Sequence, residues 1–322
     1  MMNTKLERTA LAQLKTPAKP KAASLWHRVI RNWQLYVLLL PLLLHFAIFQ
    51  YAPMYGLQIA FKNFRAIDGI WGSPWVGFDH FERFFRSYQF WNTLQNTLLI
   101  NLYDLVFAFP IAILFALMLN QVARLRFKKW VQTITYAPHF ISTVVLVGML
   151  YIFLNPRTGM INNWIDLFGG ERINFFGEAA WFKPMYVISE IWQTTGWSAI
   201  IYLAALTSVD PQLHEAAIMD GASKLQRVRH IDVPTIMPVI MIMLILKMGH
   251  FASLGFSKVL LMQNSLNIDS SEVIQTYVYK TGLVGAQYSY SAAIGLFDNL
   301  INFTLLLTMN QLAKKLKQQS LF

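Results

Sequence analysis

The chain has 322 residues, of which 55% are hydrophobic and only 13% are charged. A soluble domain carries about 25% charged residues, so this composition argues against a protein whose whole surface faces water. The absence of cysteine excludes disulfides and thiolate metal sites. The formal net charge of +11 could indicate a nucleic-acid partner, and the positions of the basic residues decide between that and a membrane protein.

Six apolar segments are long enough to cross a bilayer as helices, which takes about 20 residues each. They cover residues 33–52, 90–119, 130–154, 184–207, 234–256 and 290–311. The first and third contain no Lys, Arg, Asp or Glu, and the other four contain one such residue each: Asp104, Glu190, Lys247 and Asp298. The first segment is too long for a secretory signal. The expected fold is therefore an all-α integral membrane protein with six transmembrane helices.

Basic residues alternate between the two sides of this six-span chain. Most of the 27 lysines and arginines lie before the first span, after the second, after the fourth or after the sixth. The positive-inside rule places these four segments, and both termini, in the cytoplasm. We expect residues 1–32 to form a basic cytoplasmic tail near anionic lipid, and residues 33–322 to form the membrane domain. The net charge then reflects topology, and no nucleic-acid partner is expected.

The connection at 208–233 carries the strongest functional signal. Ser208 is a candidate N-cap and Pro211 a candidate first-turn residue of a short helix. Gly221 is placed to end that helix, and a second helical stretch then runs to Ile231 before Pro234 opens the fifth span. Periodicity alone leaves two interpretations open: a rigid element for a partner's cleft, or an amphipathic helix on the membrane surface.

This connection resembles the "EAA" loop of the permease subunits of ABC importers. The matching positions are Glu215, Ala216, Ala217, Asp220, Gly221, Ile231 and Pro234, whereas Val233 stands where the family usually has leucine. The resemblance implies that the short helix is a coupling helix, which docks into an ATPase subunit. It also implies the transmembrane architecture of a type I ABC importer.

Further stretches resemble the carbohydrate-uptake permeases similar to the larger permease of the maltose system. They lie at residues 53–56, 59–62, 76–78, 138–142, 155–162, 192–197, 277–284 and 287–290. Asp104, Lys247 and the segment 251–257 depart from the family pattern, which leaves the exact substrate open. The resemblance implies an importer of oligosaccharides or polysaccharides in the bacterial cytoplasmic membrane. Its implied partners are a second permease, expected to be a different chain, two ATPase subunits and an extracytoplasmic solute-binding protein.

Motifs for catalysis are absent from the sequence. There is no G-x-x-x-x-G-K-[ST] loop, so ATP and Mg²⁺ are expected on the separate ATPase, and this chain is expected to bind no cofactor and to be no enzyme. The seven histidines have no metal-ligand spacing. An amino-acid or peptide permease remains the main alternative. An ion-coupled secondary transporter is another, because the intramembrane charges could relay protons, but it leaves the loop at 208–233 unexplained.

Polar and aromatic residues within the spans are candidates for a substrate pathway. Charged residues at these depths cost about 2.5–3.5 kcal/mol each on insertion scales, so they usually face a cavity or a partner. The candidates are Glu190, Trp192, Gln193, Trp197, Lys247, His250, Asp298 and Asn302. Aromatic faces could stack on sugar rings and the carboxylates could bind hydroxyls. Lys247 either favours an acidic sugar, such as a uronate chain like alginate, or pairs with Asp298 or Glu190 to hold the bundle together.

Overall fold

The computed structural model describes residues 31–253, 255–315 and 320. Apart from residues 31 and 32, the predicted basic tail lies outside the described residues. The described part of the chain is helical and contains no strand, with one isolated bridge between Lys62 and Trp75. It divides into two compact units after Leu57.

In its described residues, 31–57, the first unit is a helical run with no buried side chain. It contains α3 (Trp33–Phe46), the π-helical segment η1 (Ala47–Tyr51), α4 (Ala52–Met54) and the start of the 3-10 helix η2 (Tyr55–Phe61); the label η marks π-helical and 3-10 segments alike. Its apolar side chains are exposed throughout; Leu38, for example, is 76% exposed. A helix of this length and composition needs an apolar surrounding, which agrees with the predicted first span.

The second unit is built from long helices joined by short ones. Its first half contains α5 (Gly69–Gly72), α6 (Asp79–Phe85), α7 (Tyr88–Tyr103), η3 (Asp104–Ala108), α8 (Phe109–Asn120), α9 (Leu125–Tyr136), η4 (Ala137–Phe140), α10 (Thr143–Phe153), α11 (Met160–Leu167) and α12 (Ala179–Leu206). Its second half contains α13 (Pro211–Met219), α14 (Lys224–Arg227), η5 (Val228–Asp232), α15 (Val233–Gly249), α16 (Phe256–Met262), α17 (Ile268–Ser271), α18 (Ile274–Tyr279), η6 (Lys280–Val284) and α19 (Tyr288–Lys315).

Four of the described helical runs are long and apolar enough to cross a membrane. They are Trp33–Phe61, Tyr88–Asn120, Lys224–Gly249 and Tyr288–Lys315. Counting the bent pair α9–η4 and α10 as one span gives five. The 28-residue α12 has the length of a span but a more polar sequence, and it is not among them. The structure therefore bears out an all-helical membrane architecture, while the count of six spans stays a prediction.

The predicted third span is not one straight helix. The helices on either side of residues 141–142 meet at an angle of 99°. Pro138 falls in the 3-10 turn before the break, and the extended backbone of Ser142 then caps α10. Proline and an N-cap serine are both signals for a chain to interrupt a helix, so an uninterrupted span over 130–154 was wrong.

The predicted fifth span, 234–256, begins within one residue of α15, at Val233, but its predicted end was wrong. The helical run begins at Lys224 and ends at Gly249. After a short break, α16 begins at Phe256. Asn302 of α19 holds this break, because its Oδ1 accepts from the Ala252 backbone N–H at 2.6 Å and its Nδ2 donates to the Ser253 hydroxyl at 3.1 Å.

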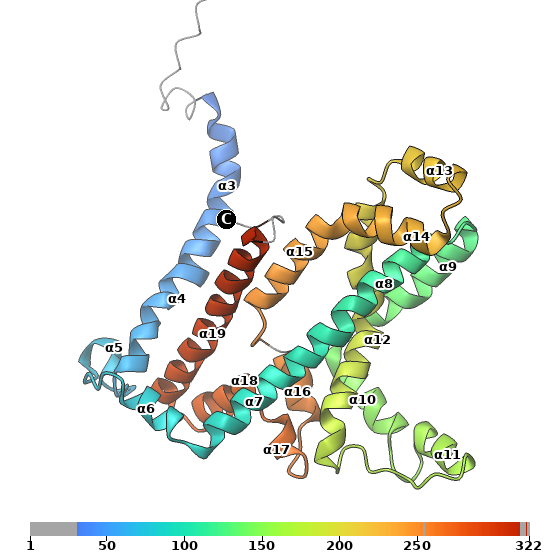
Figure 1. The fold of residues 1–322 in the computed structure, drawn as a ribbon. Helices are drawn as coiled ribbons and strands as arrows, with labels where there is room; N and C mark the ends of the chain where they lie inside the picture. The colour runs from blue at the N-terminus through green and yellow to red at the C-terminus, as the bar shows by residue number, and fades with distance from the viewer. Residues whose placement is uncertain (1–30, 254, 316–319, 321–322) are drawn as a thin grey trace, which may run out of the picture. The chain divides into compact units, whose positions relative to one another are not determined.

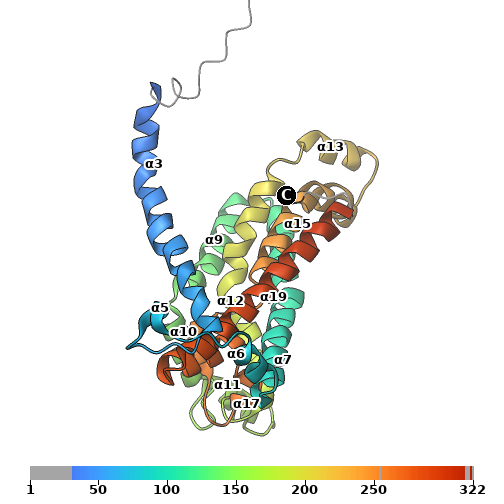
Figure 2. The same cartoon turned by 90° about the vertical axis from the view of Figure 1, so that its left-hand side faces the viewer.

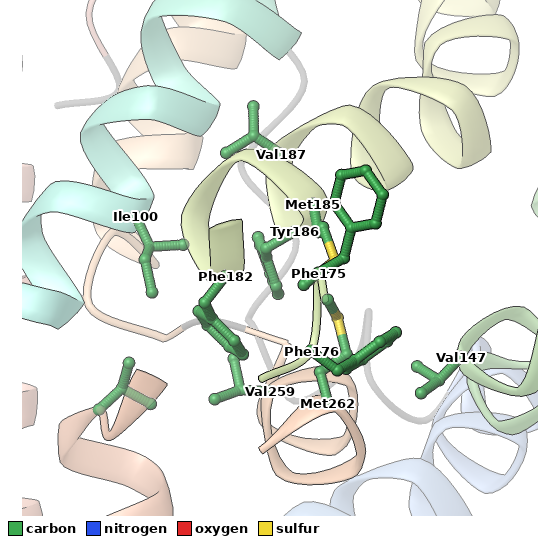
Figure 3. Packing of buried hydrophobic residues seen from close by; sticks show 11 residues of the cluster. Ile100, Val147, Phe175, Phe176, Phe182, Met185, Tyr186, Val187, Val259 and Met262 are labelled. Atoms are coloured by element: carbon green, nitrogen blue, oxygen red, sulfur yellow. The ribbon is translucent and has the colours of Figure 1, made fainter. Parts of the chain in front are cut away.

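Several small apolar cores hold the second unit together. The largest joins α7, α10, α12 and α16, and Figure 3 shows the side chains of Phe182, Tyr186, Val259 and Met262 pointing into it. Elsewhere α12 approaches α9 so closely that a Cβ on Gly196 would lie 2.2 Å from the Thr135 carbonyl oxygen. A glycine at this crossing lets the two backbones touch.

Within the second unit, α13 lies at one end and α6, α11 and α17 lie at the other (Figures 1 and 2). The long helices α7–α8, α12 and α19 run between these two ends. The connections predicted to face opposite sides of the membrane are thus separated by the length of the helices.

Candidate functional site

The short helix of the 208–233 connection is α13, and its start differs from the sequence prediction by two residues. Asp210, not Ser208, is the N-cap, and its carboxylate accepts from the Gln212 N–H at 2.9 Å. Ser208 instead donates to the Ala205 carbonyl of the preceding helix. Pro211 lies in the first turn of α13, as predicted, and is its first residue. An aspartate is as good a cap as a serine, so composition alone could not separate the two.

The end of α13 has the geometry that requires glycine. Asp220 follows the last helical residue, and Gly221 has φ +77°. The Gly221 N–H bonds to Ile218 and the Ala222 N–H bonds to Ala217, which closes the final turn. The predicted helix-ending role of Gly221 is therefore confirmed.

A second helical run follows directly. Ser223 and Gln226 form a reciprocal capping box at the start of α14. The chain continues through η5, which contains the half-buried Ile231, into α15, where Pro234 occupies the first turn. The predicted sequence of helix, glycine turn and second helix is thus present.

Exposed side chains dominate α13. It has no buried residue; Glu215 and Ala216 are exposed, and Met219 is 86% exposed. Leu213 and Ile218 are each more than half exposed. In Figure 1 the helix stands out from the end of the unit, beyond α14. An exposed apolar face beside a carboxylate suits insertion into a partner's cleft.

The intramembrane candidates converge only in part. A polar cavity of about 240 Å³ is lined by Asn101, Asp104, Tyr186, Glu190, Leu246, Lys247, His250, Phe251, Ser253 and Gly255. It brings together three of the predicted residues, Glu190, Lys247 and His250. Its carboxylates, ammonium, imidazole and amide can all hydrogen-bond the hydroxyl groups of a sugar.

Lys247 pairs with Asp104, a partner that the sequence did not indicate. The Lys247 Nζ lies 2.5 Å from the Asp104 carboxylate. The expected partners, Asp298 and Glu190, were wrong. The lysine side chain is 33% exposed and that of Asp104 15%, so the pair borders the cavity instead of being sealed beneath it.

Glu190 pairs with Lys258, a residue that the sequence prediction missed. The two charged groups are 2.8 Å apart, and the Lys258 ammonium also lies over the Tyr186 ring at 4.6 Å from its centre. Lys258 was missed because the fifth span was predicted to end at residue 256, which left this lysine in a loop. Its side chain is only 4% exposed, and α16 is the helix that places it there.

The two predicted stacking tryptophans face different cavities. Trp197 borders a cavity of about 620 Å³ that Lys247 also lines. One face of its indole is already stacked on His139, with ring centres 4.5 Å apart. Trp192 borders a separate, apolar cavity of about 510 Å³ formed by α10, α11 and α12.

Two of the remaining candidates, Gln193 and Asn302, hold helices in place. Gln193 donates to the Ile141 carbonyl at 3.0 Å, at the bend of the predicted third span. Asn302 binds the break after α15, as described above. The buried Asp298 keeps one carboxylate oxygen without a hydrogen-bond partner. His250 directly follows the end of α15, the helix that contains Lys247.

Among the described residues, no group of three His, Asp or Glu side chains could hold a metal ion. The site therefore consists of two regions of different chemistry, an exposed helix at one end and a charge-paired cavity between the long helices.

Comparison with known proteins covers most of the chain. The family model for the inner membrane component of binding-protein-dependent transport systems matches residues 108–318. Protein LplB of Bacillus subtilis (strain 168) is 46% identical over 292 residues, which are 91% of this chain and 92% of LplB. The polygalacturonan/rhamnogalacturonan transport system permease protein YteP of the same organism is 44% identical and covers 94% of this chain and 95% of its own length.

Solved structures give the same result. A chain of a bacterial ABC transporter involved in the import of the acidic polysaccharide alginate matches with a TM-score of 0.85 at 40% identity, over 90% of this chain and 98% of its own. A chain of the alginate ABC transporter in complex with an alginate pentasaccharide-bound periplasmic protein matches with a TM-score of 0.86 at 39% identity, over 92% and 99%. The expected resemblance to sugar-importing ABC permeases is confirmed.

Proposed function

Because the chain belongs to the family of inner membrane components of binding-protein-dependent transport systems, we propose that it imports an acidic oligosaccharide. In this proposal the substrate is a short chain of uronate units. Two relatives support it: YteP is named for polygalacturonan and rhamnogalacturonan, and the matching structures belong to an importer of alginate. The same relatives weigh against the amino-acid or peptide alternative.

The proposed assembly contains more chains than this one. This chain would supply six spans with both termini in the cytoplasm of a bacterium, as the alternation of basic segments indicates. One coupling helix per permease and two ATPase sites per importer imply a second permease, which we expect to be a different chain, and two ATPase subunits that bind the ATP and Mg²⁺. A matching transporter in complex with a periplasmic protein supports a solute-binding partner.

The main support for coupling of α13 to the ATPase is the turn at Gly221. Its positive φ fixes the direction in which α13 leaves the rest of the loop, and α13 has no buried side chain of its own. We place Glu215, Ala216 and Met219 against the ATPase. An apolar exposed face of this kind normally meets a protein or a membrane.

The main support for binding of an acidic substrate is the Lys247–Asp104 pair. Lys247 borders both the cavity of about 240 Å³ and the one of about 620 Å³. A uronate carboxylate could replace Asp104 as the partner of this partly exposed ammonium, without leaving a bare charge during the exchange. Lys258, in contrast, is almost fully covered and remains with Glu190.

A neutral oligosaccharide is the second candidate, and one observation favours it. Asp104 and Glu190 both line the smaller cavity beside the single lysine Lys247, so the lining is not cationic overall. Carboxylates bind sugar hydroxyls well and repel uronates.

Uptake by the reconstituted complex separates these candidates. Binding-protein-stimulated ATPase activity and uptake would be measured with size-matched uronate and neutral oligosaccharides. Selective stimulation by uronates, reduced by about tenfold in Lys247→Met with no matching loss for neutral sugars, supports an acidic substrate. Stimulation by neutral sugars alone rules it out and leaves a sugar importer in place.

A further inference from the structure

The coupling helix α13 is joined to the rest of the unit by very little. It has no buried residue and takes part in none of the apolar cores formed by described residues. Two loops hold its ends, and a helix held only in this way can rock when a partner pushes on it. Some further contact must fix its orientation if its motion is to reach the transmembrane helices.

One polar contact does so. His214, on the inner side of α13, places its Nε2 3.1 Å from the Asp232 carboxylate. The second oxygen of that carboxylate accepts from the Gln121 side-chain amide at 3.0 Å. A carboxylate only accepts hydrogen bonds, so the imidazole Nε2–H is the donor here. In the described part of the chain, His214 makes the only side-chain hydrogen bond from α13 to another helix.

Asp232 is fully buried although it is charged. Burying a carboxylate costs several kcal/mol unless its oxygens are bonded, and here each oxygen has one partner from a different element. Gln121 ends α8, Asp232 ends η5 just before α15, and His214 belongs to α13. Three elements therefore meet at a single carboxylate, which we call the Asp232 junction.

The same two long helices are joined a second time, at the cavity. Asp104 lies on the first of these helices, the run Tyr88–Asn120, and Gln121 is the C-cap of that run. Asp232 and Lys247 both lie on the second helix, the run Lys224–Gly249, and Lys247 pairs with Asp104. Both intervals span about 22–25 Å of helix at about 1.5 Å per residue. The two helices are antiparallel and are linked by polar bonds at both ends of segments of nearly equal length, and we call these two segments with their two links the frame between α8 and α15.

We propose that the Asp232 junction transmits the movement of α13 to the cavity, with Asp232 and His214 as positioning residues for coupled transport. This proposal rests on the coupling role of α13 given above. When the ATPases move α13, the bonds from His214 and Gln121 turn α8 and α15 together, and the frame carries this turn to the Asp104–Lys247 pair. Substrate release and nucleotide-driven closure are linked through this pair.

The first test measures the order of α13 in the full chain without any ATPase. The chain contains no cysteine, so cysteines in place of Met219 on α13 and Met118 on α8, both exposed, can carry spin labels without background. The distance distribution in lipid nanodiscs should be narrow in the otherwise unchanged chain. It should broaden in His214→Phe, which keeps the ring shape and removes the donor, and narrow again in His214→Gln.

The second test measures uptake per ATP hydrolysed in the complete reconstituted complex. His214→Phe should lower this ratio at least about fivefold, and His214→Gln should restore most of it, because the amide can donate to Asp232. His230→Phe is the matched control, since among the described residues the His230 ring bonds only to the Gln226 carbonyl of its own helical run. Its ratio should stay within about twofold of the unchanged chain.

Asp232→Leu should lower the uptake per ATP hydrolysed as much as His214→Phe does. If Asp232→Leu does not fold, the His214 variants decide the question, because replacing His214 opens no buried cavity. A narrow distance distribution in His214→Phe, or an unchanged ratio, overturns the proposal. If α13 does not couple to the ATPase at all, Gly221→Val would leave uptake by the complex unchanged. Failure of the proposed function can therefore be distinguished from failure of the Asp232 junction.

Discussion

The loop at 208–233 and the charge-paired cavity differ in how their structure is determined. In the loop, the contacts that cap the two helices and close the glycine turn join residues within five positions: Asp210 to Gln212, Ser223 to Gln226, Ala222 to Ala217. In the cavity, the ion pairs join residues 143 and 68 positions apart. Local contacts follow from residue type and spacing, whereas distant ones depend on how helices pack.

We expect the strongest loss of transport from a substitution at the glycine turn that ends α13. Gly221→Val places a β-branched residue at φ +77°, a conformation such residues rarely adopt, and should reduce ATP-dependent uptake at least about tenfold while membrane insertion stays normal. Transport assays in proteoliposomes with quantified protein check this. Gly221→Asn should be milder, because asparagine tolerates this conformation.

Gly148→Val is the matched control for this substitution. Gly148 lies in α10 without a positive φ, and no neighbouring atom lies within 4 Å of the place where a Cβ would be. Its uptake should stay close to that of the unchanged chain. Equal uptake by Gly221→Val and Gly148→Val would show that α13 needs no fixed exit angle.

These contrasts explain what the sequence could predict. The helix, glycine turn and second helix of the loop were predicted because caps, a glycine and a proline act over one or two turns, although Asp210 and Ser208 are equivalent as caps. The membrane helices were located by apolar length, but the breaks near Pro138 and Gly249 were not, since their cost is offset by Gln193 and Asn302 from other helices. Lys247 and Glu190 were identified as unusual, whereas their partners required the fold.

The next substitution removes a contact between residues far apart in the sequence, the ion pair of Glu190 and Lys258. Glu190→Leu removes the partner of the buried Lys258 and leaves an uncompensated ammonium, so we expect a loss of about 3 kcal/mol in the free energy of unfolding. Thermal unfolding in nanodiscs measures it. The double variant Glu190→Leu/Lys258→Met should recover most of the loss, because apolar groups can replace a buried pair. A double variant as unstable as the single one would contradict a pairwise interaction.

A smaller effect is expected at the other ion pair, because it borders the cavity. Asp104→Asn and Lys247→Met should each lower the free energy of unfolding by about 1–2 kcal/mol, less than at Lys258, since water can reach the remaining charge. The double-mutant cycle gives the coupling between the two side chains. A coupling close to zero would mean that the contact contributes nothing to the frame between α8 and α15.

We expect the weakest loss of stability at Gln193, where the measurement distinguishes a residue that holds helices together from one that binds substrate. Gln193 was predicted in the substrate pathway, but its amide bonds to the Ile141 carbonyl at the bend between η4 and α10. Gln193→Ala should therefore cost about 1 kcal/mol in the free energy of unfolding and leave the KM for uptake unchanged. Ser198→Ala, at an exposed position lining the cavity of about 620 Å³, is the control for simple loss of a polar group there. If Gln193→Ala raises KM while the unfolding midpoint stays fixed, Gln193 releases the Ile141 carbonyl during transport and binds the sugar, as its place in the sequence first indicated.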